Sequence, residues 1–261
     1  MHQHRKDIIN LVRQVGKIQK KAFGSPLNVQ TKKNDGWLDL VTEIDHQSEK
    51  IYFDYLKRHF PDHTILSEES LAHNVGRATR WIIDPLDGTI NYAHGLPFFG
   101  TSIALEENNQ VTMGAIYDPL RYELFYTDDT GAYLNDQKIK VNDQPLAHSI
   151  IATEIIPRQD KLPKLLAYLN QLSPRARTVK SLGAMVLEMA YVACGRLSAF
   201  VVADTYFPWD IAVGQLLVTK AGGRCTDWQG QAVNLKTCQP LIASNGICHD
   251  EILKLAPKKS N

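Results

Sequence analysis

The sequence predicts a mixed α/β fold in which two sheets are interleaved with layers of helices. Three observations support this prediction. Apolar residues recur at helical spacing near the N-terminus, strand-like segments separated by turn residues follow, and helices and strands then alternate toward the C-terminus. Of the 261 residues, 44% are apolar, which is enough to bury a full core. We expect two halves, residues 1–145 and 146–261, that pack together as one structural unit.

The first half is expected to begin with two helices. The first ends near Gly24-Ser25-Pro26, and its apolar positions follow a helical period: Ile8, Leu11, Val12, Val15, Ile18 and Ala22. The second runs from about Asp45 to about Phe60. A strand is expected at 81–83, and strand-like segments at 100–106, 111–117 and 123–127 are separated by Asn and Asp turn residues. The last three segments predict an antiparallel meander.

The second half is expected to alternate between helices and strands. Helices are predicted over residues 162–172, 182–194 and 210–221, and a strand over 197–202. The last helix is followed by Gly222-Gly223, and glycine suits the left-handed residue with which many helices end.

Composition and charge exclude several classes of protein. Lys plus Arg (29) nearly balances Asp plus Glu (28), so no bulk field favours nucleic acid or an anionic membrane. Three basic residues, Arg175, Arg177 and Lys180, could contact RNA, but without interleaved aromatic residues they read better as a solvated face. No apolar run approaches the roughly 20 residues needed to span a bilayer, and the N-terminus has no signal-peptide core. The four cysteines form no C-x-x-C pair and are interpreted as reduced thiols of a cytoplasmic protein.

The most informative segment is residues 81–91, Trp-Ile-Ile-Asp-Pro-Leu-Asp-Gly-Thr-Ile-Asn. An apolar strand ends there in two carboxylates, Asp84 and Asp87, which repel each other and are costly to bury without a cation. A hard divalent cation would compensate them, because oxygen ligands suit Mg²⁺ and Pro85 stiffens the turn. The alternative is an ordinary Asp-Gly turn after a strand.

Carboxylates stand in three similar settings elsewhere in the chain. Asp45 lies at the start of a predicted helix, and helix N-capping is an equally good explanation for it. Glu68 ends a short apolar strand, where a solvated loop is the alternative. Asp210 opens a helix, and capping is again the alternative. Strand ends and helix starts are where ligand sites form in α/β proteins, and a donor set of oxygens alone favours Mg²⁺ or Mn²⁺ over zinc.

At this point the chain resembles the inositol monophosphatase family. Residues 81–92 resemble the first family signature, and Trp-Asp-Ile-Ala-Val-Gly (209–214), followed by Ala-Gly-Gly, resembles the second. Two short motifs, Asp-Leu-Val-Thr-Glu-Ile-Asp and Ser-Glu-Glu-Ser, occur in the expected order, and the resemblance covers essentially the whole chain. It implies a layered α-β-α-β-α sandwich, often dimeric, and a phosphatase that uses two or three Mg²⁺ ions, or Mn²⁺, on a small phosphorylated substrate.

The resemblance also implies roles for individual residues. The metal ligands would be four carboxylates and one carbonyl oxygen: Glu68, Asp84, Asp87, Asp210 and the carbonyl of Leu86. Asp84 would bridge two ions. Thr89, hydrogen-bonded to Asp45, would orient and deprotonate the attacking water, with Glu68 completing the catalytic group. Gly88 and Thr89 would offer backbone amides to the phosphate.

The sequence departs from the family on the substrate side. Animal members have a Glu seven residues before the second-motif Asp, where this chain has Ala203, with Asp204 beside it. The family's substrate stretch appears as Gly183-Ala184-Met185, which lacks the usual hydroxyl. Inositol monophosphate is the favoured substrate, and fructose bisphosphate, a nucleotide bisphosphate and NADP remain alternatives. A non-catalytic protein that binds a phosphorylated ligand is the alternative from another class.

Overall fold

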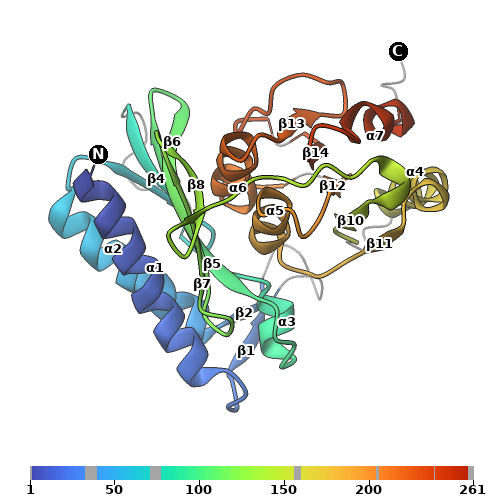
Figure 1. The fold of residues 1–261 in the computed structure, drawn as a ribbon. Helices are drawn as coiled ribbons and strands as arrows, with labels where there is room; N and C mark the ends of the chain where they lie inside the picture. The colour runs from blue at the N-terminus through green and yellow to red at the C-terminus, as the bar shows by residue number, and fades with distance from the viewer. Residues whose placement is uncertain are drawn as a thin grey trace.

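The computed structural model describes residues 2–32, 40–70, 78–155, 160–203, 206–237 and 239–257. Five layers follow one another across the molecule (Figure 1). Helices α1 (His2–Ala22) and α2 (Glu43–His59) form the first layer, and a seven-stranded sheet forms the second. Helices α5 (Met185–Ala193) and α6 (Pro208–Lys220) lie between this sheet and a five-stranded sheet, whose outer face carries α4 (Leu162–Leu172) and α7 (His249–Leu255). The predicted α-β-α-β-α sandwich is therefore confirmed.

The larger sheet places its strands in the order of the sequence. They are β3 (Thr64–Ser67), β4 (Thr79–Asp87), β5 (Gly100–Glu107), β6 (Gln110–Asp118), β7 (Glu123–Asp128), β8 (Gly131–Leu134) and β9 (Gln137–Lys138). Only β3 and β4 pair in parallel, and β4 to β9 pair antiparallel, which confirms the meander. Helices cover both faces of β4. Trp81 and Ile83 pack toward α1 and α2, and Ile82 packs toward α5 and α6, which explains the continuous apolar run in the sequence.

The smaller sheet has the order β11 (Thr178–Lys180), β10 (Ile150–Thr153), β12 (Ala199–Val202), β14 (Leu241–Ser244) and β13 (Arg224–Asp227). The strands β11, β10 and β12 run parallel, so the carboxyl ends of β10 and β12 lie together at one edge. Strand β14 runs antiparallel to both of its neighbours, β12 and β13. Helix α6 is buried nearly all round because it lies between the two sheets.

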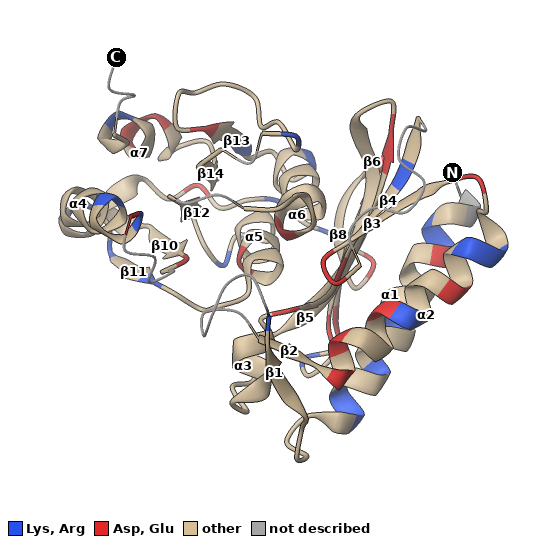
Figure 2. Ribbon diagram, turned by 180° about the vertical axis from the view of Figure 1, so that it is seen from behind, with Lys and Arg blue, Asp and Glu red and all other residues tan. Residues whose placement is uncertain are grey.

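Smaller elements flank the larger sheet. Strands β1 (Val29–Thr31) and β2 (Leu40–Thr42) form a two-stranded antiparallel pair, and α3 (Thr89–Ala93) follows β4 after one residue. Two 3-10 turns, Leu146–His148 before β10 and Ser173–Arg175 after α4, occur in the second half of the described chain. Figure 2 shows both signs of charge along α1 and α2. Among the described residues, no helix combines the length and the apolarity that crossing a bilayer requires.

Several predicted boundaries differ from the structure; the strand expected at 197–202, for example, begins at Ala199. The helix expected at 182–194 begins only at Met185, because Gly183 has a φ of +80° and Ala184 is extended. The helix expected from Asp210 begins at Pro208, whose fixed φ suits a first helical position. Strand β4 ends in Asp84 and Asp87 as expected, and its register against β5 shifts between these two residues.

Candidate active site

The carboxylates at the end of β4 are buried. Asp84 is 2% exposed, and its Oδ1 atom has no hydrogen-bond partner among the described residues. Pro85, which lies within the irregular part of the β4–β5 pairing, cannot donate a ladder hydrogen bond. Its carbonyl oxygen accepts a hydrogen bond of 2.7 Å from Gln19 Nε2 of α1. Gln19 thus fixes the turn from α1, while Asp84 Oδ1 has no partner in the described ranges.

Gly88 connects β4 to α3 in a conformation that a side chain would not tolerate. Its φ is +81°, and an added Cβ would lie 3.0 Å from the Gly183 carbonyl oxygen and 3.1 Å from the Ala184 Cβ. The turn at Gly88 therefore packs directly on residues 183–184. These two segments, nearly a hundred residues apart in the sequence, form one wall of the candidate site.

Thr89 and Asp45 are in hydrogen-bond contact. Thr89 Oγ1 donates to Asp45 Oδ1 at 2.9 Å and lies 2.8 Å from the Leu86 carbonyl oxygen. The other Asp45 oxygen, Oδ2, accepts hydrogen bonds from the backbone N–H and the hydroxyl of Thr42. Thr42 is the N-cap of α2 and Asp45 its third residue, so the alternative that Asp45 is the N-cap was wrong by three positions. One carboxylate thus serves the helix start and Thr89 at once, and burial raises its pKa to about 6.

Asp87 and Asp210 each accept hydrogen bonds at the start of a helix. The Met185 and Val186 backbone N–H groups donate to Asp87 at 3.2 and 3.0 Å, and both belong to the first turn of α5. Asp210 is the third residue of α6 and accepts the Phe207 N–H at 2.6 Å. Free amides at helix starts favour a negative charge, which explains how these carboxylates are held.

Glu68 lies close to a cation of the chain itself. Lys32 Nζ is 2.6 Å from Glu68 Oε1 and 2.8 Å from Glu69 Oε1. Glu68 also acts on the buried aspartates, since it contributes to the raised pKa of Asp84 and of Asp210. The side chain therefore belongs to the same electrostatic unit.

The acidic residues raise one another's pKa. Burial is the largest cause of the raised pKa of Asp84, followed by the charges of Glu68, Asp87 and Asp210. For Asp87 the causes are burial, then Asp210 and Glu154. As the side chains stand, no three His, Cys, Asp or Glu groups within the described ranges lie close enough together to hold a metal ion. The donor set nevertheless fits a hard divalent cation, because it consists of oxygens and includes a buried carboxylate oxygen without a partner in the described part of the chain.

The predicted substrate residues divide into three groups. Gly88, Gly183 and Ala184 pack together, and Met185 donates its N–H to Asp87. Ala203 is 6% exposed and belongs to the outer core beneath α4 and α7, so it offers no polar contact. Asp204 lies outside the described residues.

Two glutamates near the site, Glu154 and Glu188, were missed by the sequence reasoning. Glu154 follows β10 directly, and its charge raises the pKa of both Asp87 and Asp210. Glu188 is fully buried on α5. A signal existed for the second, since a lone carboxylate within the apolar run Met-Val-Leu-Glu-Met-Ala-Tyr-Val-Ala needs a buried partner.

This fold, with acidic groups at the end of β4 and at the starts of α2 and α6, defines a class of phosphate-ester hydrolases. The chain belongs to the inositol monophosphatase family, which it matches over residues 2–261. Members of this family are metal-dependent phosphatases, and the chain is accordingly a phosphoric monoester hydrolase.

Individual relatives support this assignment over nearly the whole chain. The chain is 35% identical to the fructose-1,6-bisphosphatase/inositol-1-monophosphatase of Thermotoga maritima, over 95% of this chain and 93% of the relative. The structure of extragenic suppressor protein SuhB from Bartonella henselae is 32% identical, with a TM-score of 0.89 over 97% of both chains. An IMPase/NADP phosphatase complexed with Mg²⁺ and phosphate shares the fold, with a TM-score of 0.83 at 24% identity over 97% of this chain and 95% of that one.

Proposed function

We propose that this phosphatase requires Mg²⁺ and hydrolyses a small phosphomonoester, with inositol monophosphate as the favoured substrate. The observation that carries the metal requirement is the buried Asp84 Oδ1 atom, which has no partner among the described residues, together with the carboxylates whose charges raise the pKa of Asp84. Glu68, Asp84, Asp87 and Asp210, with the Leu86 carbonyl oxygen, would hold two or three ions, and Asp84 would bridge two of them. Mn²⁺ would fit the same oxygens.

The bound cations would supply Lewis-acid polarisation of the phosphate and a lowered pKa for the attacking water. The chain itself supplies the route for the proton. Thr89 Oγ1 can accept a proton from the water only if its own hydrogen goes to an acceptor, and Asp45 Oδ1 lies 2.9 Å away for that purpose. With its pKa raised to about 6, Asp45 is a better base near neutral pH than an ordinary aspartate. Glu68 would complete this group.

The phosphate would be placed by the turn at Gly88, whose backbone N–H, with that of Thr89, would bind its oxygens. Glycine suits this turn because its φ is +81° and an added Cβ would lie only 3.0 Å from the Gly183 carbonyl oxygen. The alcohol would be chosen by residues 183–185 and by Asp204. Ala203 lacks the carboxylate that animal members use, so fructose bisphosphate, a nucleotide bisphosphate and NADP stand as alternative substrates. We also propose that the protein is a homodimer.

Phosphate release from a panel of inositol, sugar and nucleotide phosphates, each with Mg²⁺ and with excess EDTA, tests the proposal. We expect the highest kcat/KM for inositol monophosphate and no turnover in EDTA. Full turnover in EDTA would refute the metal requirement. A higher kcat/KM for fructose bisphosphate or NADP would show that this compound is the favoured substrate instead. The proposed metal site would be unaffected by that result.

A further inference from the structure

The two carboxylates at the end of β4 share one face of the sheet because the strand contains a bulge. Side chains alternate between the faces of a strand, so residues three positions apart, such as Asp84 and Asp87, would ordinarily point to opposite faces. In the pairing with β5, however, Asp84 lies opposite Ser102. Asp87 lies opposite Gly100, so two residues of β4 oppose a single residue of β5. Because Ser102 and Gly100 are two positions apart, the bulge places both carboxylates on the same face.

This common face is the one that α5 and α6 cover (Figure 1). Before the bulge, Ile82 packs into the core on that side. After the bulge, a Cβ added at Gly100 would lie 3.3 Å from Leu187 Cδ2 of α5, and Asp87 accepts two N–H groups of the same helix. A strand without the bulge would point Asp87 toward α1 and α2, away from Asp84. The carboxylate cluster therefore depends on the bulge.

Side chains from two other elements bind the backbone of the bulge. Thr101, the β5 residue that the bulge opposes, donates its hydroxyl to the Asp84 carbonyl oxygen at 2.9 Å. Gln19 Nε2 of α1 donates to the Pro85 carbonyl oxygen at 2.7 Å. Both Thr101 and Gln19 are fully buried, so these hydrogen bonds do not compete with water. Two successive carbonyl oxygens of the bulge are thus held by side chains that belong to other elements.

A second hydroxyl lies behind Thr101. The hydroxyl of Tyr52, on α2, is 2.8 Å from Thr101 Oγ1, and Tyr52 is also fully buried. A carbonyl oxygen can only accept a hydrogen bond, so the single hydrogen of the Thr101 hydroxyl goes to Asp84, and Tyr52 is the donor to Thr101. Two hydrogen bonds in series therefore run from α2 through β5 to the backbone of Asp84. They reach the bulge from the face that α1 and α2 cover, opposite the carboxylates.

We propose that Gln19, Tyr52 and Thr101 are positioning residues that hold the bulge of β4 and thereby keep Asp84 and Asp87 together on one face, where cations can bind both. The three side chains act through the backbone of the bulge, from the far side of the sheet. The inference rests on the proposed function in assigning cations to these carboxylates. Groups that hold metal ligands in place typically change metal affinity by roughly 10- to 100-fold.

The first test measures Mn²⁺ affinity without substrate, by electron paramagnetic resonance. Thr101→Val keeps the shape of the side chain but removes the donor to the Asp84 carbonyl oxygen, and we expect Mn²⁺ affinity to fall by roughly 10-fold or more. Thr101→Ser keeps the hydroxyl and should retain most of the wild-type affinity. Thr127→Val is the matched control, because Thr127 is a buried threonine of β7 that donates to the Gly131 carbonyl oxygen. It loses the same kind of hydrogen bond and should leave Mn²⁺ affinity unchanged.

Tyr52→Phe tests the two hydrogen bonds in series. We expect it to weaken Mn²⁺ binding less than Thr101→Val does, because the Asp84 carbonyl oxygen keeps its Thr101 donor. In the Thr101→Val background the Tyr52 hydroxyl has already lost its acceptor, so adding Tyr52→Phe should cause no further loss of affinity. Additive losses would show that Tyr52 acts independently of Thr101 and would overturn its place in the proposal.

Hydrogen exchange in EDTA, followed by mass spectrometry, tests the hold on the bulge without any cation. We expect the amides of residues 84–89 to exchange faster in Thr101→Val than in Thr127→Val, because only the first variant loses its hydrogen bond at the bulge. If Thr101→Val binds Mn²⁺ as tightly as wild type, or if exchange at residues 84–89 is the same in the two variants, the proposal is wrong.

A second variant keeps the test decisive if Thr101→Val fails to fold. Gln19→Met leaves the Pro85 carbonyl oxygen without its donor, and the same two results are expected of it, with the same two outcomes refuting the proposal. A wild-type protein that binds no Mn²⁺ would refute the metal requirement proposed above. The exchange comparison would then decide by itself whether these side chains hold the bulge, so the two failures can be told apart.

Discussion

Replacing Asp84 by Asn is expected to stabilise the metal-free protein and to abolish its response to Mg²⁺. Asp84 is 2% exposed, its Oδ1 atom has no partner in the described part of the chain, and the charges of three further carboxylates raise its pKa. Burial and these charges raise the pKa of Asp84 well above its ordinary value in the folded protein, whereas in the unfolded chain the group ionises as usual. The folded state therefore has the less favourable protonation at neutral pH, and Asn removes that penalty because it does not ionise.

The size of the effect has an upper bound. Protonating a carboxyl of ordinary pKa 3.8 at pH 7 costs about 4 kcal/mol. The Asn amide also needs partners in this buried position, so we expect a gain of about 2 kcal/mol, half the bound. In a chain of this size that corresponds to a rise in Tm of roughly 4–8 °C. A hundredfold excess of Mg²⁺ over Kd should stabilise the wild-type protein by about 2.7 kcal/mol and so raise its Tm, and it should have far less effect on the variant.

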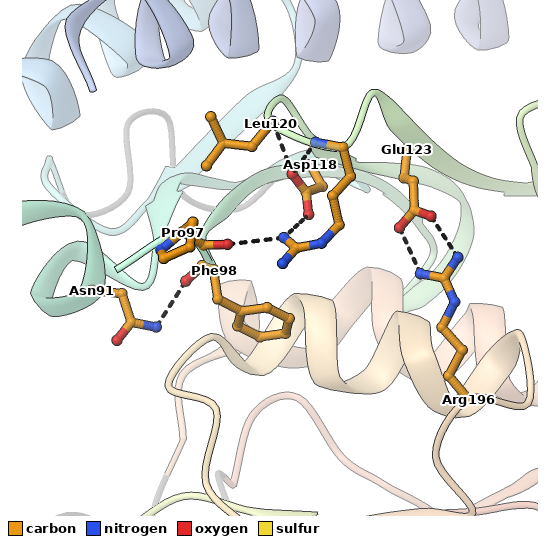
Figure 3. A network of polar contacts seen from close by, with 8 residues as sticks. Asn91, Pro97, Phe98, Asp118, Leu120, Glu123 and Arg196 are labelled. Carbon is orange, nitrogen blue, oxygen red and sulfur yellow. Dashed lines mark hydrogen bonds and ion pairs between the residues drawn. The ribbon is translucent and has the colours of Figure 1, made fainter. Parts of the chain in front are cut away.

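Asp118→Asn is the matched control. Asp118 is also fully buried, but its oxygens accept the backbone N–H groups of Leu120 and Arg121, and it is ion-paired with the Arg121 guanidinium (Figure 3). Here the substitution removes a compensated charge and should lower Tm. Calorimetry of both variants in EDTA and in Mg²⁺ gives the comparison. If Asp84→Asn lowers Tm in EDTA as Asp118→Asn does, the reasoning about an uncompensated carboxylate fails.

Three other expectations concern catalysis, stability and specificity. Thr89→Ala should lower kcat by roughly 10²-fold with little change in KM, the scale for loss of a proton-transfer group; a retained kcat with a raised KM would make Thr89 a residue that only positions phosphate. His249 is buried between two hydroxyl partners and its pKa is lowered to about 4. The unfolded chain therefore takes up this proton first, so the contribution of His249 to stability is complete above about pH 6.5 and is lost toward pH 4, by up to about 3 kcal/mol. Chemical denaturation of wild type and His249→Gln should show the steeper acid loss in wild type, and equal slopes would contradict the buried neutral imidazole. Asp204→Ala should change the ratio of kcat/KM between inositol monophosphate and NADP, and a constant ratio would place specificity elsewhere.

The elements that the sequence predicted well are those with long, uninterrupted patterns. Helix α1 shows a continuous helical period, and the meander of β5 to β7 has turn residues between its strands. The end of β4 could be predicted as acidic because two carboxylates follow an apolar run. These features are local, and a sequence displays local features directly.

The features that could not be predicted depend on contacts between distant segments. The helix expected at residue 182 begins three residues later because Gly183 packs against Gly88 and Asn91, from another part of the chain. Glu154 likewise acts on Asp87 from the end of β10, far away in the sequence, and it has no motif around it. Spacing within a sequence carries no information about such contacts between distant segments.

Asp84 differs from the other aspartates of the site in its hydrogen bonds. This difference predicts opposite effects of an Asp→Asn substitution at Asp84 and at Asp87. Asp87 binds the free amides of α5, and Asp210 binds the Phe207 N–H at the start of α6. Asp84 Oδ1 has no such amide among the residues that the structure describes. Asp87→Asn would keep one oxygen for two N–H donors, so one amide of α5 would lose its partner at a cost of about 1–3 kcal/mol. That loss offsets the relief of repulsion, and we expect Tm in EDTA to stay unchanged or to fall, whereas Asp84→Asn raises it. In Mg²⁺ we expect Asp84→Asn to lose more metal affinity than Asp87→Asn, because Asp84 is the carboxylate proposed to bridge two ions. Equal changes in Tm for the two variants would show that the helix-start amides do not distinguish these carboxylates.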